Sequence, residues 1–168
     1  FITTDNIKAY NTKDFEVPIK NLNINTKEYS ILIIDDNLDI LNYLKDILMD
    51  DYTVLQAENG DLGYEVASSE IPDLIISDVM MPGKDGITLC KDLKSQITTS
   101  HIPIILLTAR TSTVFEVEGL KTGADDYITK PFNANVVKAR IASLLENREK
   151  LRAHLLNKVR FEPTEADF

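Results

Sequence analysis

Short apolar runs alternate with helix-spaced apolar residues through most of this chain. Five runs have the length of a β-strand, and they lie at 31–34, 52–57, 73–76, 103–107 and 126–129. Between them, apolar residues recur at the three- and four-residue spacing of an amphipathic helix. Strands that alternate with helices predict an α/β domain with a parallel sheet, and right-handed crossovers place helices on both of its faces.

The predicted helices centre on 38–48, 62–67, 87–93, 114–120 and 137–145, and the last one continues its apolar spacing through Leu151, Leu155 and Leu156. Turn residues separate the segments, as in Asn59-Gly60 and Pro82-Gly83. The expected fold is therefore a doubly wound, flavodoxin-like (βα)5 domain with a five-stranded parallel sheet in the order 2-1-3-4-5.

The segments before and after this pattern differ from it. Residues 1–29 contain five Asn without apolar periodicity, which predicts a linker or the tail of an upstream domain. Residues 30–150 form the predicted domain, and 151–168 a helical extension or connector to an output domain. The whole net charge of −9 falls within 30–150, which holds 20 acids and 11 bases. An acidic domain of this kind does not favour direct binding to nucleic acid, although it suits a cation.

Other classes are excluded by simple counts. The chain has one cysteine, so it has no internal disulfide and no cysteine-rich metal site. Its apolar runs are far shorter than the roughly 18 residues of a membrane span, and no secretory signal pattern is visible. We therefore expect no membrane contact by this part of the chain and a cytoplasmic location, on a parent protein that can itself be membrane-anchored.

Polar side chains follow four of the apolar runs. They are Asp35 and Asp36 after the first run, Asp78 after the third, Thr108 after the fourth and Lys130 after the fifth. Each residue alone has an ordinary explanation as a helix cap, a turn former or a solvated charge. However, the carboxyl ends of parallel strands share one edge of the sheet, and ligands bind at that edge where the strand order reverses. We therefore expect these five side chains to converge.

Three carboxylates at one edge repel each other. At about 4 Å and an effective dielectric constant near 20, each like-charged pair costs about 4 kcal/mol. Lys130 supplies one compensating charge, and Mg²⁺ would supply two, bound by carboxylate oxygens, water and phosphate oxygens. The sequence thus predicts a Mg²⁺ site, with Mn²⁺ as the alternative ion.

A carboxylate, a hydroxyl, a lysine and a divalent-ion site suit phosphoryl transfer. An aspartate is already ionised at neutral pH, since its unperturbed pKa is about 3.9, so it needs no general base. Asp78 is the predicted nucleophile. Lys130 and the metal ion would neutralise the phosphoryl oxygens during in-line attack.

These motifs together resemble the response-regulator receiver domain of two-component signalling. The resemblance covers about residues 30–150 and rests on "LIIDDN" (32–37), "DLIISDVMMPGKDG" (73–86), "PIILLTA" (103–109) and "GADDYITKPFN" (123–133). It implies a phosphoacceptor domain rather than an enzyme with its own turnover. The flanking segments are similar to those of hybrid sensor histidine kinase/response regulators, so the parent chain is expected to be a histidine kinase or a separate response regulator.

The resemblance assigns a role to each site residue. Asp78 would accept the phosphoryl group, and Asp36, Asp78 and the backbone carbonyl of Met80 would ligate Mg²⁺ directly. Asp35 would act through a metal-bound water and Lys130.

Two further residues would transmit the signal. Thr108 would turn its hydroxyl toward the phosphoryl oxygen, and Tyr127 would rotate inward as Thr108 moves. The resemblance also implies a cis peptide bond between Lys130 and Pro131.

The implied partners follow from this role. A histidine kinase would donate the phosphoryl group, and the face formed by the fourth helix, fifth strand and fifth helix would switch an output domain in the same or another chain, with transcription as the expected output. A homodimer through that face or through the C-terminal helix is also allowed. Phe115 on the fourth helix is a candidate contact residue there.

Three other functions remain open at this level. An Asp-nucleophile phosphatase of the haloacid dehalogenase type would want a second Asp two residues after the nucleophile, where this chain has Met80. A flavodoxin-like cofactor binder would want a Ser/Thr/Gly-rich phosphate loop after the first strand, where this chain has "DDNLD" (35–39). A docking module that works without phosphorylation would not need the complete site.

Overall fold

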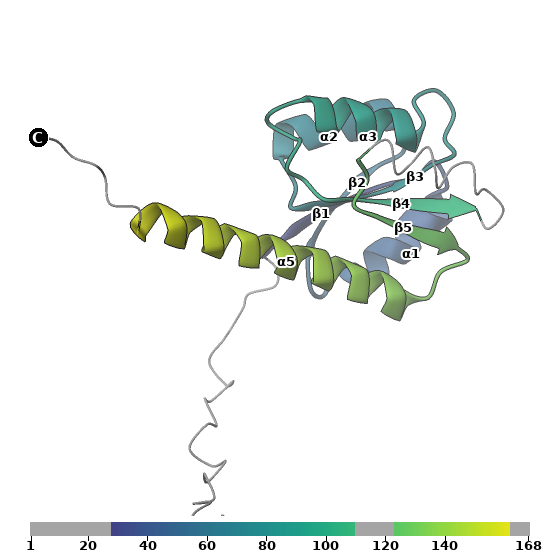
Figure 1. Ribbon diagram of the computed structural model, residues 1–168. Helices are drawn as coiled ribbons and strands as arrows, with labels where there is room; N and C mark the ends of the chain where they lie inside the picture. The colour runs from purple at the N-terminus through teal and green to yellow at the C-terminus, as the bar shows by residue number, and fades with distance from the viewer. Residues whose placement is uncertain (1–27, 110–122, 162–168) are drawn as a thin grey trace, which may run out of the picture.

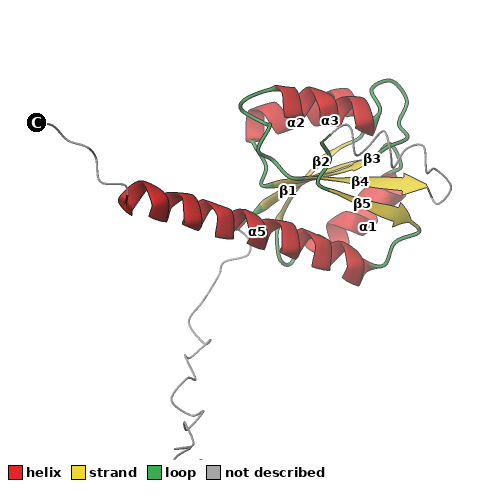
Figure 2. Ribbon diagram, in the orientation of Figure 1, coloured by secondary structure: helices red, strands yellow, loops and turns green. Residues whose placement is uncertain are grey.

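A five-stranded parallel sheet forms the centre of the molecule (Figures 1 and 2). The computed structural model describes residues 28–109 and 123–161. The strands are β1 (Ser30–Ile34), β2 (Thr53–Ala57), β3 (Leu74–Asp78), β4 (Ile104–Ala109) and β5 (Asp126–Lys130). Their order is β2-β1-β3-β4-β5 and every neighbouring pair is parallel, which confirms the predicted fold class.

Helices cover both faces of the sheet. The described helices are α1 (Leu38–Leu48), α2 (Gly60–Glu70), α3 (Gly86–Ser95) and α5 (Ala134–Phe161). Figure 1 shows α2 and α3 on one face and α1 and α5 on the other. The first three begin at side-chain caps, since the Asn37, Asn59 and Asp85 oxygens accept hydrogen bonds from backbone N–H groups of the first turn. The fourth expected helix and Phe115 lie outside the described residues.

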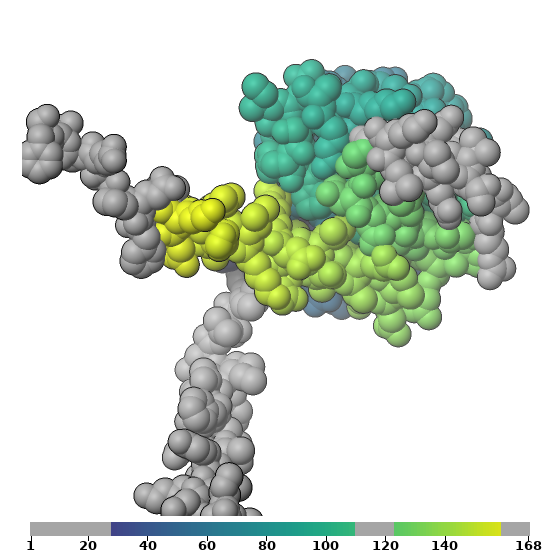
Figure 3. Space-filling model, in the orientation of Figure 1, coloured from purple at the N-terminus to yellow at the C-terminus, as the bar shows by residue number. Residues whose placement is uncertain are grey.

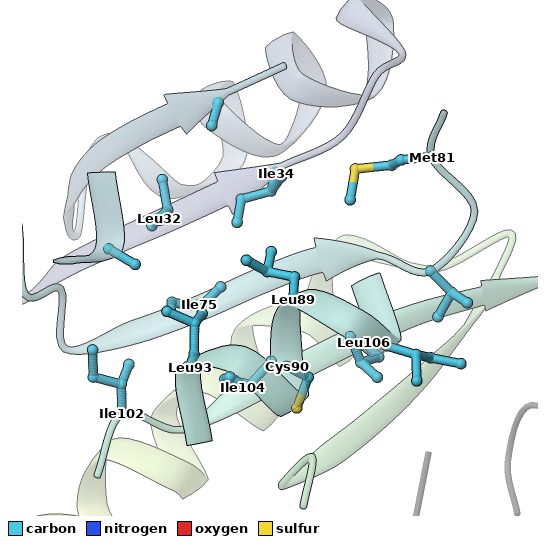
Figure 4. Close-up of a cluster of buried hydrophobic side chains, with 14 residues drawn as sticks. Leu32, Ile34, Ile75, Met81, Leu89, Cys90, Leu93, Ile102, Ile104 and Leu106 are labelled. Atoms are coloured by element: carbon cyan, nitrogen blue, oxygen red, sulfur yellow. The ribbon is translucent and has the colours of Figure 1, made fainter. Parts of the chain in front are cut away.

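Alternating strand residues divide the core into two layers, because successive side chains on a strand point to opposite faces. In β1, Leu32 and Ile34 join the layer under α2 and α3, whereas Ile31 and Ile33 join the layer against α1 and α5. Figure 4 shows the first layer, in which α3 contributes Leu89, Cys90 and Leu93. The central strands are therefore buried on both sides and hold the ends of β1 and β3 in fixed positions.

The apolar helix stripes are not all buried. Leu38 and Leu62 belong to the predicted stripes, yet they are 56% and 44% exposed. Leu38 is the first residue of α1 and lies at its rim. In α2, Gly63 faces the sheet instead, and a Cβ there would overlap the side chain of Ile34. The close approach of α2 to β1 thus depends on a residue without a side chain, which an apolar-spacing rule does not detect.

Helix α5 is much longer than the sheet it covers. Its 28 residues span about 42 Å at 1.5 Å per residue. Val137, Ile141 and Leu145 are buried against the sheet, whereas the last turns project beyond the domain (Figure 3). The expected extension past residue 150 is therefore helical, and it continues α5 without a break. The proposed domain boundary at 150 stays a prediction.

Candidate functional site

The register of the sheet brings the predicted site residues to one edge. Ile34 of β1 pairs with Ser77 of β3, so Asp35 follows at the level of Asp78. Asp78 also pairs with Leu107 of β4. Lys130 ends β5, and its long side chain extends back toward Asp35 and Asp78. The convergence expected from the strand ends is confirmed for these residues.

The three carboxylates form one cluster with a lysine beside it. One carboxylate oxygen from each of Asp35, Asp36 and Asp78 lies within 4.8 Å of the others. The Nζ atom of Lys130 lies 3.2 Å from Asp35 Oδ2 and 3.0 Å from Asp78 Oδ1. Asp35 is 1% exposed and Asp78 7%, while Asp36 is open to solvent. This negatively charged cluster of Asp35, Asp36 and Asp78, called the acidic pocket below, has two buried carboxylates and one that is exposed to solvent.

Local structure fixes both sides of the pocket. The Asp35 N–H donates to the Ala57 carbonyl at 3.2 Å, and Asp35 Oδ1 accepts from the Asn37 N–H at 2.9 Å. On the other side, Gly86 packs so closely under Asp78 that a Cβ would overlap the Asp78 carbonyl oxygen. The turn after β3 therefore returns directly beneath the proposed nucleophile, and this requires the glycine of "KDG".

The pocket disfavours the charged form of Asp78. Burial raises the pKa of the Asp78 carboxyl above its usual value, and repulsion from Asp35 and Asp36 adds to this. The hydrogen bond and charge of Lys130 lower the pKa in opposition. The balance is a net penalty on the third negative charge. A cation with more charge than one lysine would remove that penalty, so the donor set fits Mg²⁺, which prefers oxygen ligands.

Thr108 and Tyr127 lie on the face of the sheet that α2 and α3 cover. Thr108 is 3% exposed and shares the strand face of Leu106, which belongs to the layer under α3. Tyr127 pairs with Leu106 across β4 and β5 and packs against the same layer, with its hydroxyl oxygen buried. The register therefore places Tyr127 two residues before Thr129, the partner of Thr108, and their coupled movement stays a prediction.

Two expectations concern the connecting loops. The Lys130–Pro131 peptide bond is cis, as the resemblance implied. The side chain of Met80 is 61% exposed and lines a depression of about 380 Å³ with Met81, Pro82, Gly83 and Asp85. The side chain of Met80 therefore has no part in the core, and the role of its backbone carbonyl as a metal ligand stays a prediction.

Sequence reasoning missed Lys84, which anchors the same loop. Its Nζ atom lies 2.7 Å from Asp92 Oδ2 on α3 and 4.8 Å from the centre of the Tyr64 ring on α2. Asp61 lies 4.0 Å away, and the carboxylates raise the pKa of Lys84, led by its hydrogen bond to Asp92. A loop lysine gives no sequence signal for this role, because the contacts depend on α2 and α3 being adjacent.

Together, the sheet order and the side chains at its edge define a doubly wound α/β domain with three carboxylates and a lysine gathered at the carboxyl ends of its strands. Comparison with known proteins identifies the family. The family model of the response regulator receiver domain matches residues 31–142. The chain therefore belongs to the response regulator receiver domain family of two-component signalling, as the sequence motifs implied.

Individual relatives agree with this assignment. Histidine kinase P4 from Formosa agariphila is 40% identical over 171 residues, which cover 98% of this chain and 12% of that protein. The alkaline phosphatase synthesis transcriptional regulatory protein PhoP from Bacillus subtilis is 41% identical over 71% of this chain and 49% of its own length. The chain thus spans half or less of these curated relatives.

Solved receiver domains share the fold. The signal receiver domain of a signal transduction histidine kinase from Syntrophus aciditrophicus has a TM-score of 0.68 and 35% identity, over 83% of this chain and 97% of that one. Chemotaxis response regulator CheY4 from Vibrio cholerae has a TM-score of 0.65 and 31% identity, over 68% of this chain and 97% of that one.

Within 28–109 and 123–161, no helix combines the length and apolarity needed to cross a bilayer.

Proposed function

We propose that Asp78 accepts a phosphoryl group from a phosphohistidine of a histidine kinase, in a reaction that depends on Mg²⁺. The observation that supports this most directly is the cluster of Asp35, Asp36 and Asp78 within 4.8 Å, with Lys130 3.0 Å from Asp78 Oδ1. Buried like charges are costly, and a site that retains them suits a ligand that carries positive charge.

Asp36, Asp78 and the Met80 carbonyl would hold the ion, with Asp35 acting through a bound water and Lys130. Asp36 is the exposed member of the cluster, so the ion can enter from solvent. When bound, Mg²⁺ supplies Lewis-acid stabilisation of the phosphoryl oxygens, and Mn²⁺ can replace it.

The chain's own residues carry the transfer. A carboxylate oxygen of Asp78 forms the new P–O bond while the P–N bond to the donor imidazole breaks. The electron pair of the P–N bond stays on the imidazole nitrogen. Lys130 lies close enough to Asp78 to hold a phosphoryl oxygen by charge and hydrogen bonding. β3 is buried along its whole length, so the nucleophile is rigidly positioned.

Thr108 and Tyr127 would convert phosphorylation into a change of surface. The Thr108 hydroxyl would bond to the phosphoryl oxygen and move toward the pocket, and Tyr127 would move inward with it. The hydroxyl oxygen of Tyr127 is already buried, so the proposed movement would bring the ring further toward Thr108 rather than from solvent into the core. The face formed by the helix expected at 114–120, by β5 and by α5 would then be the output surface.

The setting of the domain is also proposed. The relative Histidine kinase P4 aligns with 98% of this chain, flanks included, which supports a hybrid histidine kinase as parent. On this model 1–29 is a linker, 30–150 the receiver and 151–168 the connector to an output domain, with transcription as its readout. The proposal also includes a homodimer through this output surface or through the C-terminal helix. It further includes a cytoplasmic location and no direct contact of this region with nucleic acid.

A phosphatase of the haloacid dehalogenase type is less well supported. The residue two positions after Asp78 is Met80, and its side chain cannot exchange a proton. The same position therefore offers no acid for leaving-group protonation. A flavodoxin-like cofactor site is disfavoured by the three carboxylates, which would repel a phosphate group in the absence of a cation.

The test is phosphorylation by a small donor, measured as intact mass. With acetyl phosphate and Mg²⁺, one phosphoryl adduct is expected on the wild type and none on Asp78→Asn. EDTA should abolish the adduct. The matched control Asp39→Asn removes an exposed carboxylate from the first turn of α1 and should leave phosphorylation unchanged. Wild-type protein that stays unmodified while folded would contradict the proposal, and sustained release of phosphate from generic phosphoesters would favour the phosphatase.

A further inference from the structure

The projecting part of α5 borders an apolar groove at the end of the domain opposite the acidic pocket. The groove has a volume of about 520 Å³ and is lined by His101, Arg148, Leu151, Arg152, Leu155 and Leu156. All three leucines are more than half exposed. His101 comes from the loop before β4, so the groove lies between that loop and the helix.

This groove continues the packed face of α5. The buried Val137, Ile141 and Leu145 are followed at helical spacing by Arg148, Leu151 and Leu155, so the same stripe runs off the end of the sheet. Covering the exposed leucines of this stripe would be favourable, because each Å² of apolar surface removed from water contributes about 25 cal/mol. The exposed stripe therefore offers a surface on which a further apolar segment could pack.

The chain enters the domain beside this groove. The Ser30 N–H donates to Asp73 Oδ2 at 2.7 Å, and Arg148 donates to the Asp73 carbonyl at 2.9 Å. Burial and a hydrogen bond to the Glu149 carboxylate raise the pKa of the Tyr29 hydroxyl. Tyr29 thus contacts α5 at Glu149, next to the turn at which the groove begins, and Ser30 is linked to Arg148 through Asp73.

We propose that residues 14–19, "DFEVPI", dock into the groove as an extended strand-like segment. Phe15, Val17 and Ile19 alternate with polar residues, so an extended backbone places them on one edge. Pro18 favours an extended conformation for the residue before it.

Charge complementarity favours residues 14–19 over a second copy of α5 as the occupant of the groove. The two acids of the segment, Asp14 and Glu16, match the cationic rim formed by Arg148 and Arg152. Arg148 already contacts Asp73, whereas Arg152 makes no ion pair within the described part of the chain. A second copy of α5 would instead bring Arg148 and Arg152 against an equally basic groove, which is unfavourable.

The chain between Ile19 and Glu28 can span the distance to the groove and still keep the segment close to it. Eight residues lie between Ile19 and Glu28, and the nine Cα-to-Cα steps across them reach about 30 Å when extended. The groove runs about 12 Å along α5, from Arg148 to Leu156. A tethered segment of this length acts at an effective concentration in the millimolar range, so weak contacts suffice to keep it docked. This inference does not depend on phosphorylation of Asp78.

Amide hydrogen exchange along α5 tests the proposal in the full 168-residue chain. A docked segment protects the helix against local opening, so Phe15→Asp with Val17→Asp should speed exchange at residues 152–158 about tenfold. The matched control, Ile7→Asp with Tyr10→Asp, adds the same charge outside the segment and should leave those rates unchanged. Arg152→Glu should also speed exchange, and Glu16→Arg in that background should restore protection, because the pair is then reversed.

Four outcomes would overturn the proposal. Equal effects of the two double variants would show that the sequence of 14–19 is irrelevant. Protection that falls on hundredfold dilution of the wild type would identify a second copy as the occupant. Loss of protection on deleting 162–168 alone would identify the acidic C-terminal end instead. An unchanged exchange rate in the Phe15→Asp, Val17→Asp chain would refute docking outright.

Discussion

Replacing Asp78 by Asn should stabilise the metal-free protein, although it removes the proposed reactive group. Asp78 repels Asp35 and Asp36 across at most 4.8 Å, which costs about 3.5 kcal/mol for each pair at an effective dielectric constant of 20. Its attraction to Lys130 at 3.0 Å returns about 5.5 kcal/mol on the same scale. The difference is about 1.5 kcal/mol, and the cost of burying the charge raises the net penalty to roughly 2–3 kcal/mol.

The direction of the pKa shift agrees with this sign. Because the pKa of Asp78 is raised in the folded state, the folded protein binds more protons than the unfolded chain between the two pKa values. Stability therefore falls as pH rises through that window, and the penalty is fully present above the folded-state pKa. Asn carries no charge, so the Asp78→Asn substitution removes this penalty.

Urea unfolding followed by far-ultraviolet circular dichroism measures the effect. In EDTA at pH 7, the midpoint for Asp78→Asn should exceed that of the wild type at an unchanged slope. Added Mg²⁺ should stabilise the wild type by about 1.4 kcal/mol at ten times its dissociation constant and the variant much less. An Asp78→Asn protein that is less stable than the wild type in EDTA would refute the electrostatic account of the pocket.

Three further predictions concern the surroundings of the site. Gly86→Ala should destabilise the fold by about 3 kcal/mol or more, because its Cβ overlaps the Asp78 carbonyl, and thermal unfolding would show it; a change under 1 kcal/mol would contradict the close packing. Lys84→Met should raise the Mg²⁺ concentration for half-maximal phosphorylation about tenfold by loosening the loop that carries Met80, and an unchanged value would leave Lys84 purely structural. Burial and the nearby Arg148 and Lys94 lower the pKa of His101, so stability should fall as pH drops below 6.5, and His101→Asn should flatten that part of the pH profile of unfolding.

The sequence was sufficient for the sheet and for most of the pocket. Strand-length apolar runs define the central strands, and their polar ends define Asp35, Asp78 and Lys130, because a parallel sheet brings those ends together. Edge strands were harder to judge, since β2 and β5 are only half-buried. Contacts between separate elements, such as Lys84 with Asp92, could not be predicted, because spacing along the chain contains no information about which helices are neighbours.

The length of α5 has a mechanical consequence. The helix begins four residues after Lys130 at the acidic pocket and ends beyond the opposite edge of the sheet. Its projecting part, from Leu151 to Phe161, extends about 15 Å past the packed part. If the packed part rotated by about 10°, the tip would move sideways by about 3 Å, a distance comparable to half a helical turn. A small shift at the pocket would thus reach whatever follows residue 161 as a displacement large enough to make or break a side-chain contact.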